Sequence, residues 1–104
     1  MVSINGEEWR LAFTSPNHPM LRRSDGSYTI GAISDLTKTI YIREGLEPTL
    51  MKKVLCHELT HAAMFSYNID LSIEQEELLA DLIATYGQEI IYMTNKIFCR
   101  LKHK

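Results

Sequence analysis

The chain has 104 residues and a formal net charge of −2, with 45% hydrophobic and 23% charged residues. These values are typical of a globular protein, and the length predicts a single domain spanning residues 1–104. A charge so close to neutral gives no general attraction to nucleic acid or to a membrane surface.

The first residues and the two cysteines predict a soluble cytoplasmic protein. Residues 1–8 have neither a basic start nor a long apolar run, so they do not resemble a signal peptide. No stretch approaches the 18 apolar residues typical of a transmembrane helix. Two cysteines, Cys56 and Cys99, do not make a disulfide framework, as expected for a reducing compartment.

The first half of the chain predicts short strands. Residues 2–13 alternate apolar and polar side chains around Asn5-Gly6, which indicates either a tight hairpin or one bent strand. Residues 14–25 hold two prolines and several small polar residues, which predicts a loop. Two further strands are expected at residues 27–32 and 39–42, paired as a hairpin. The predicted sheet is therefore small and antiparallel.

Two helices are expected after the strands. Glu47-Pro48 favours a helix start, and this helix should run to about Ser66 or Tyr67. Ser72 is a good N-cap for a second helix that runs from Ile73 to at least Met93. The predicted apolar face of that helix contains Ile73, Ala80, Ile83, Ala84, Gly87 and Ile91. The basic tail, residues 100–104, is expected to fray.

The clearest chemical signal is H-E-x-x-H, formed by His57, Glu58 and His61. Histidines four residues apart lie on one face of a helix, so both imidazoles can bind one cation at about 2.0–2.1 Å. Glu58 points to the side of that face, where it can reach a water beside the metal without being a ligand. The arrangement predicts a zinc hydrolase in which Glu58 is the catalytic base.

A catalytic zinc site needs a third protein ligand, which the second helix should supply. We predict Glu77, because Asp81 lies one turn later and can accept the free imidazole N–H of a ligand histidine. Glu76 is the alternative third ligand, since a carboxylate on an apolar face is costly unless it is paired or binds a metal. Glu74 is better explained as a helix-start acid on a solvated face.

Three segments together resemble one peptidase family: I-Y-I at 40–42, T-L-x-x-x-V-L-C-H-E-L-T-H-A at 49–62, and E-E-L-L-A-D-L-I-A-T-Y at 76–86. The chain resembles the small ImmA/IrrE-type metallopeptidases over roughly residues 28–92, especially short versions from phages and integrated elements of Gram-positive bacteria. The resemblance implies an α+β minimal zincin, with a small sheet, an H-E-x-x-H helix and a ligand-bearing helix. It also implies a bacterial or phage-infected host cell.

The predicted activity is that of a gluzincin-like zinc metalloendopeptidase, with Zn²⁺ held by His57, His61 and Glu77. The substrate is expected to be a protein or peptide, and the resemblance suggests a repressor or another regulator. The strand at 39–42 is expected to be an edge strand that pairs with an extended peptide. Arg22 and Arg23, if they lie near the cleft, would steer an acidic substrate.

Three further points stay open. Tyr41 and Tyr86 are candidate oxyanion donors, although packing roles are commoner for such tyrosines. The metal could be structural or vestigial in an interaction protein, and Cys56 or Glu76 as a fourth ligand would indicate this. A metal-free helical-hairpin protein is the other alternative. Oligomeric state is not predicted by the sequence.

Overall fold

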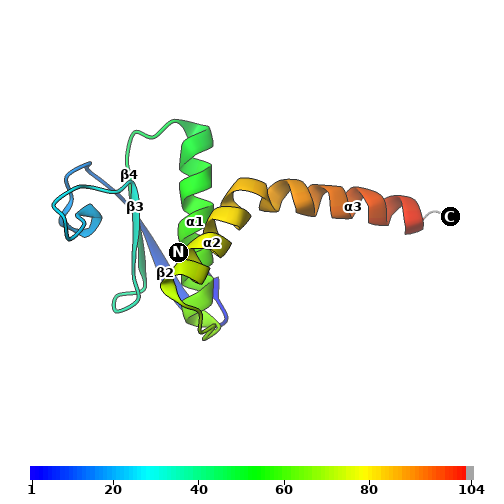
Figure 1. Cartoon of the computed structure of the whole chain (residues 1–104), viewed down its shortest axis with the longest axis horizontal. Coiled ribbons are helices and arrows are strands. Elements are labelled where there is room, and N and C mark those ends of the chain that lie inside the picture. The colour runs from blue at the N-terminus through cyan, green and yellow to red at the C-terminus, as the bar shows by residue number, and fades with distance from the viewer. Residues whose placement is uncertain (103–104) are drawn as a thin grey trace.

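A four-stranded sheet with one helix packed across it forms the body of the protein, and a long second helix follows (Figure 1). The computed structural model describes residues 1–102, so the last two residues of the predicted basic tail lie outside the described residues. The predicted α+β class is confirmed. The elements are β1 (Val2–Ile4), β2 (Glu7–Thr14), β3 (Gly31–Ser34), β4 (Thr39–Arg43), α1 (Pro48–Ser66), α2 (Ile73–Leu82) and α3 (Gln88–Lys102).

The sheet is mixed, with strand order β1-β2-β4-β3, rather than wholly antiparallel as predicted. β1 and β2 form a tight antiparallel hairpin, and Asn5 and Gly6 take the positive φ angles of 48° and 79° that such a turn requires. β2 then pairs in parallel with β4, because the chain crosses back through the loop and β3 before β4 begins. β4 is therefore an inner strand, and β3 is the edge strand beside it, with β1 at the opposite edge.

The predicted hairpin of the third and fourth strands is confirmed, but β3 occupies residues 31–34 instead of 27–32. Two of the residues just before Gly31 are hydrogen-bonded to the preceding loop. Tyr28 forms an isolated bridge with Arg22, and the backbone N–H of Thr29 donates to the carbonyl of Leu21. These bonds take up the backbone groups that would otherwise have extended the strand.

The core lies between the sheet and α1. Its fully buried members are Trp9 from β2, Ile40 and Ile42 from β4, and Ala62 from α1. The indole Nε1–H of Trp9 donates to Oγ of buried Ser66 over 2.7 Å. This hydrogen bond joins the N-terminal hairpin to the end of α1, which fixes how the helix lies across the sheet.

Both helix starts are confirmed. The carboxylate of Glu47 accepts hydrogen bonds from the backbone N–H groups of Thr49 and Leu50, and Pro48 is the first residue of α1. Ser72 caps α2 and forms a capping box with Gln75. The second helix is continuous to Lys102, and a π-helical turn, η2 (Ile83–Gly87), separates α2 from α3.

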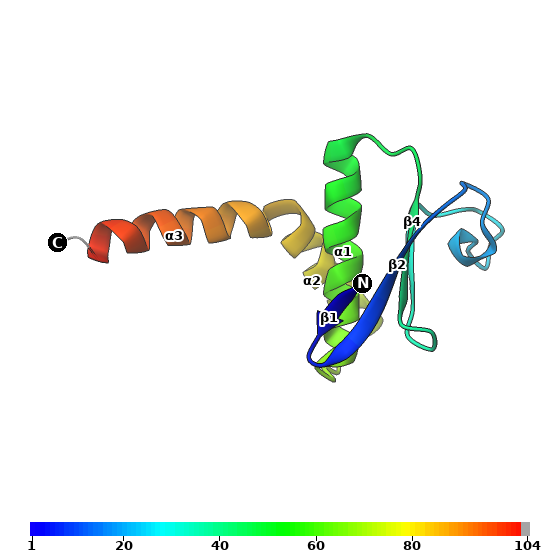
Figure 2. The same cartoon turned by 180° about the vertical axis from the view of Figure 1, so that it is seen from behind.

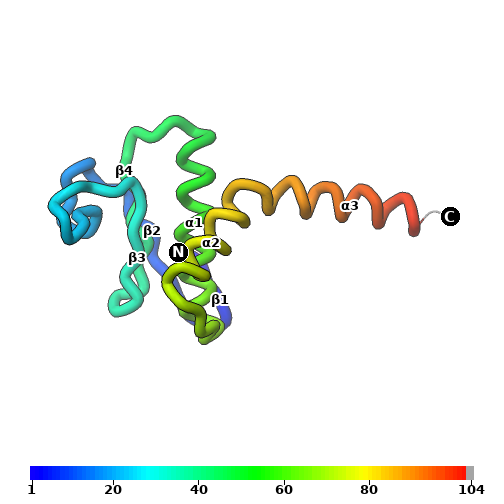
Figure 3. Tube along the Cα trace, viewed as in Figure 1, coloured from blue at the N-terminus to red at the C-terminus, as the bar shows by residue number. Residues whose placement is uncertain are grey.

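The predicted apolar face of the second helix is only partly correct. Ala80 is buried and Ile83 is half-buried, as expected, because this part of the helix packs on α1. Ile73 and Ile91 are exposed. Ile73 is the first residue of α2, and Ile91 follows η2, after which the helix leaves the domain. Figures 2 and 3 show α3 running out from the domain.

None of the helices within residues 1–102 combines the length and the apolar character that crossing a lipid bilayer requires.

Candidate metal centre

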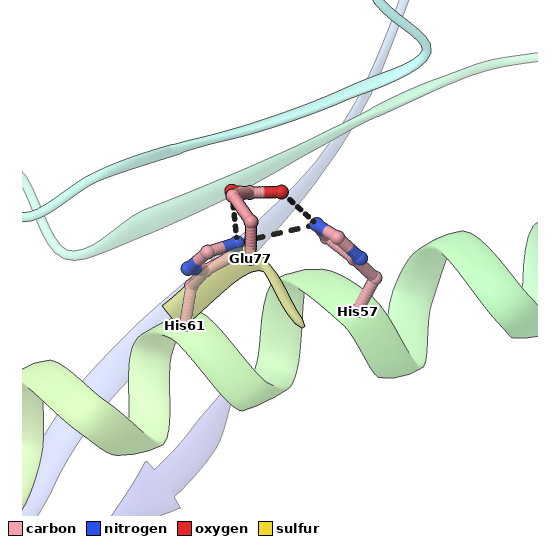
Figure 4. Close-up of side chains that lie close together, drawn as sticks. All are labelled: His57, His61 and Glu77. Atoms are coloured by element: carbon pink, nitrogen blue, oxygen red, sulfur yellow. Dashed lines mark hydrogen bonds and ion pairs between the residues drawn. The ribbon is translucent and has the colours of Figure 1, made fainter. Parts of the chain in front are cut away.

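Three side chains from α1 and α2 converge on one point (Figure 4). Nε2 of His57 and Nε2 of His61 lie 3.2 Å apart on the face of α1 that meets α2. The carboxylate of Glu77 bridges them, with its oxygens 2.9 Å from Nε2 of His61 and 3.4 Å from Nε2 of His57. The structure therefore brings together the two histidines and the third ligand that the sequence predicts.

The outer nitrogen of each imidazole faces a carboxylate. Nδ1 of His61 is hydrogen-bonded to Oε1 of Glu76 over 2.6 Å, and Nδ1 of His57 lies 3.0 Å from Oδ1 of Asp81. An ionised carboxylate can only accept, so each imidazole can donate from Nδ1 to its outer acid, which leaves Nε2 free to bind a cation. Both Nε2 atoms then carry lone pairs aimed at the same point.

This arrangement fits a divalent cation. Ligand atoms at about 2.0–2.1 Å from a tetrahedral ion stand about 3.3 Å apart. The two Nε2 atoms are 3.2 Å apart, and each lies 2.9 or 3.4 Å from one oxygen of Glu77. Two facing lone pairs repel each other unless a proton or a cation lies between them. Two imidazoles and a carboxylate, each imidazole backed by an acid, are a donor set that a metal ion satisfies. His57, His61 and Glu77 are thus able to hold a metal.

Glu58 lies beside these ligands and is buried. Its Oε1 is 4.0 Å from Nε2 of His57, and its Oε2 has no hydrogen-bond partner among the described residues. Burial raises the pKa of the Glu58 carboxyl; nearby His57 and His61 oppose that rise and Glu77 adds to it. The predicted catalytic base is therefore a buried carboxyl next to the candidate metal site.

A cleft opens beside the site between α1, α2 and the edge of the sheet. Its lining includes His57, Glu58, Glu77 and Asp81. It also includes Gly31, the first residue of β3, and the two residues before it, Thr29 and Ile30. Two cations, Arg23 and Lys53, lie along the same cleft. Arg23, which the sequence identifies as a possible steering residue, is therefore at the cleft.

Gly31 lies where the edge strand approaches α1. A Cβ added at this position would stand 2.7 Å from Cγ1 of Val54 and 3.2 Å from Cγ of Glu58. The absence of a side chain at Gly31 lets the strand approach the base closely. Sequence reasoning did not assign Gly31 to the site, and the only signal was a glycine within a predicted strand.

Several sequence candidates lie elsewhere. Tyr41 stacks on His18, with ring centroids 5.6 Å apart, and Tyr86 is exposed in η2; neither lines the cleft. The cluster of possible ligands does not include Cys56, which is a free thiol, and Glu76 faces Nδ1 of His61 instead of the common point. No fourth protein ligand therefore completes the cluster within residues 1–102.

Comparison with known proteins gives one informative match. Residues 10–91 match the family model described as the IrrE N-terminal-like domain, an M78 peptidase family. No curated protein and no solved structure matches the chain significantly. The matched residues include β4, α1 and α2, which carry or support every side chain of the candidate centre. Because this model spans well over half of the sequence, the chain belongs to the M78 peptidase family with the IrrE N-terminal-like domain.

Proposed function

We propose that this protein is a zinc-dependent endopeptidase that cleaves a protein substrate. The proposal rests mainly on the Nε2 atoms of His57 and His61, which lie 3.2 Å apart with the Glu77 carboxylate beside both. Membership of a peptidase family supports the reaction class. Two imidazoles and one carboxylate, with no further protein ligand, are the donor set of a catalytic zinc site.

A bound zinc ion supplies Lewis acidity, which polarises a carbonyl and favours ionisation of water. The protein supplies the base. Oε1 of Glu58 lies 4.0 Å from Nε2 of His57, so this carboxyl would take a proton from the attacking water. The same carboxyl would then deliver that proton to the amide nitrogen as the C–N bond breaks. Glu76 and Asp81 would hold the two imidazoles in the required tautomer and orientation.

The substrate would bind as an extended segment along β3. This strand is one edge of the sheet, and its start lines the cleft beside Glu58. Exposed backbone groups of an edge strand can pair with an incoming peptide. This role belongs to β3 and not, as the sequence suggested, to the inner strand β4. A repressor or another regulatory protein is the substrate class that the family resemblance favours.

The test compares metal content and cleavage in matched variants purified without chelators. Elemental analysis of the native protein should find about one zinc per chain, as expected for a single set of three ligands. His61→Ala should lose the metal, whereas His18→Ala, a histidine outside the cleft, should keep it. Glu58→Gln should keep the metal and lose cleavage of a proteome-derived peptide library read by mass spectrometry.

The outcomes separate the proposal from its alternatives. Metal in the native protein with no cleavage of the library or of candidate repressors would favour a zinc-stabilised interaction protein. No metal after zinc add-back, with equal thermal stability in the presence and absence of chelator, would favour a metal-free binding protein. Full cleavage by Glu58→Gln would remove Glu58 from the role of base.

A further inference from the structure

Helix α3 is unpartnered within the described chain. It continues directly from η2, and all of its residues, from Gln88 to Lys102, are exposed. The protein is 56 Å long but only 31 Å by 28 Å across, and its radius of gyration is 15.8 Å, above the roughly 13 Å of a compact domain of this length. Isolated helices of about 12–15 residues are marginal in water, so a partner would be needed to stabilise α3.

One face of α3 is strongly apolar. Ile90, Thr94, Ile97 and Leu101 follow one another at the spacings of a helical seam, and other apolar residues flank them. Six large side chains of this face are between 47% and 62% exposed: Ile90, Ile91, Met93, Ile97, Phe98 and Leu101.

The exposed area is enough for one side of a stable dimer. At roughly 150–200 Å² for each fully exposed side chain, the six present on the order of 500 Å² of apolar surface. A standard interface removes about 800 Å² from each partner, of which a little over half is apolar. A second α3 helix would cover a stripe of this length, since both are about 22 Å long.

The charges on α3 select the direction of that second helix. Glu89, Lys96 and Arg100 lie along the same flank of the apolar face, within a sector of about 40° at 100° per residue. The acid is at the start of the helix and the bases are towards its end. In two antiparallel copies this flank of one helix meets the same flank of the other, so each acid lies beside the bases of the second copy. In two parallel copies the flank meets the opposite flank of the partner, where Glu89 has no base beside it.

We propose that α3 pairs with α3 of a second copy of this chain in an antiparallel, twofold-symmetric dimer. Ile90 would lie opposite Leu101 of the second copy, and Glu89 would reach Arg100 of that copy. The C-terminal end of each α3 would enter the apolar groove where α3 leaves the other domain. That groove is lined mainly by Cys56, Leu82, Ile83, Gly87, Ile90 and Ile91.

The dimer would leave both candidate metal centres open. Cys56, the α1 residue that lines the groove, lies about 100° around α1 from His57 and further still from His61. The substrate cleft is on the other side of the helix, where α1 meets α2 and β3. This inference therefore does not depend on the proposed function, and either can fail alone.

The test measures mass in solution by sedimentation velocity across micromolar concentrations. The native chain should sediment as a dimer. Ile97→Asp should raise the dissociation constant of the dimer about a hundredfold or more. In a symmetric dimer one substitution removes two buried isoleucines, one from each copy. The control is Cys99→Asp, which places the same charge on the opposite face of α3, and it should leave the dimer intact. Fluorescence of the single tryptophan, Trp9, should show that each variant keeps the domain folded.

Charge exchange tests the antiparallel arrangement. Glu89→Lys and Arg100→Glu should each raise the dissociation constant of the dimer about fivefold, because each ion pair occurs twice in a symmetric dimer. The double variant should bind about as tightly as the native chain. A native monomer at all concentrations would overturn the proposal. A dimer unaffected by Ile97→Asp would place the interface elsewhere, and single variants without recovery in the double variant would reject the antiparallel pairing.

Discussion

Oε1 of Glu76 lies 2.6 Å from Nδ1 of His61, on the side of the imidazole away from Glu77. Glu76 was the alternative to Glu77 as third ligand. In the structure it accepts a hydrogen bond from a candidate ligand instead of facing the common point. This pairing also removes the cost of a half-buried carboxylate, since His61 supplies its partner. Asp81 has the corresponding position behind His57.

Replacing either of these acids should weaken metal binding. Glu76→Gln or Asp81→Asn should lower zinc affinity about 10–100-fold, because the imidazole loses a charged acceptor that fixes its tautomer and raises its basicity. Competition with a chromophoric chelator measures this affinity. Glu74→Gln, an exposed acid of the same helix outside the cluster, is the control and should bind zinc as the native protein does. Equal affinities in all four proteins would contradict the assigned roles.

Glu58→Gln should stabilise the metal-free protein at neutral pH. The native protein buries a carboxyl with an unpartnered oxygen, and burial raises its pKa. Such a group favours folding when protonated and opposes it when charged, so native stability falls as pH rises through the raised pKa. The gain in stability from Glu58→Gln should be absent at pH values below the ordinary glutamate pKa of about 4.3, and it should grow as the pH rises above that value. Thermal melts across pH measure it; a gain confined to acid pH would contradict this account.

Ser66→Ala should destabilise the whole domain. Its hydroxyl accepts the only side-chain N–H of buried Trp9, and alanine would leave that donor without a partner. The expected cost is about 1–3 kcal/mol, to be measured by urea unfolding followed through Trp9 fluorescence. Ser24→Ala, at an exposed serine of the loop, is the matched control and should leave the midpoint unchanged.

Gly31→Ala should impair catalysis more than metal binding. The new Cβ would collide with Val54 and press on Glu58. Its three nearest atoms belong to these two residues and not to the candidate metal ligands. Overpacking of this kind costs about 1–3 kcal/mol. Zinc affinity within twofold of native, together with a clear loss of cleavage, is the expected result. A variant that cleaves like the native protein would show that the strand yields without moving the base.

Arg23 and Lys53 should favour substrates with acidic residues near the cleaved bond. Both cations line the cleft, and neither has a carboxylate within 4 Å among the described residues. Glu substitutions at both positions should reduce the acidic preference of sites cut in the peptide library, and the native preference should fade at high salt. Arg22→Glu, at an exposed arginine outside the cleft lining, is the control. An unchanged cleavage profile would leave these cations without a role in specificity.

Local signals predicted the elements that depend on neighbouring residues. Asn5-Gly6 adopts the positive φ angles of a tight turn, Pro48 starts α1, and Ser72 caps α2. The spacing of His57 and His61 was sufficient to predict that their imidazoles converge, since a helix sets that geometry by itself. Glu77 and Asp81 also lie beside the two histidines, because their separation of one turn matches that of His57 and His61.

Long-range pairing was not predictable in the same way. Alternation in β2 and β4 specifies which face each strand buries, but it does not specify which strand lies beside it, so the parallel pairing was missed. The role of Glu76 depends on the angle at which α2 crosses α1, which helical periodicity does not contain. The exposure of Ile91 likewise depends on η2, the π-helical turn after which the helix leaves the domain. No residue pattern within Ile83–Gly87 predicts that turn.

The turn η2 holds one more residue than an α-helix would place there, within a helix that is otherwise continuous from Ile73 to Lys102. One extra residue shifts the phase of all later residues by about 100°. Deletion of one residue within this turn would leave Glu77 and Asp81 in place and would rotate the apolar face of α3 relative to the domain. The candidate metal centre and the direction of the apolar face of α3 can thus change separately, with the boundary between them at one helical turn.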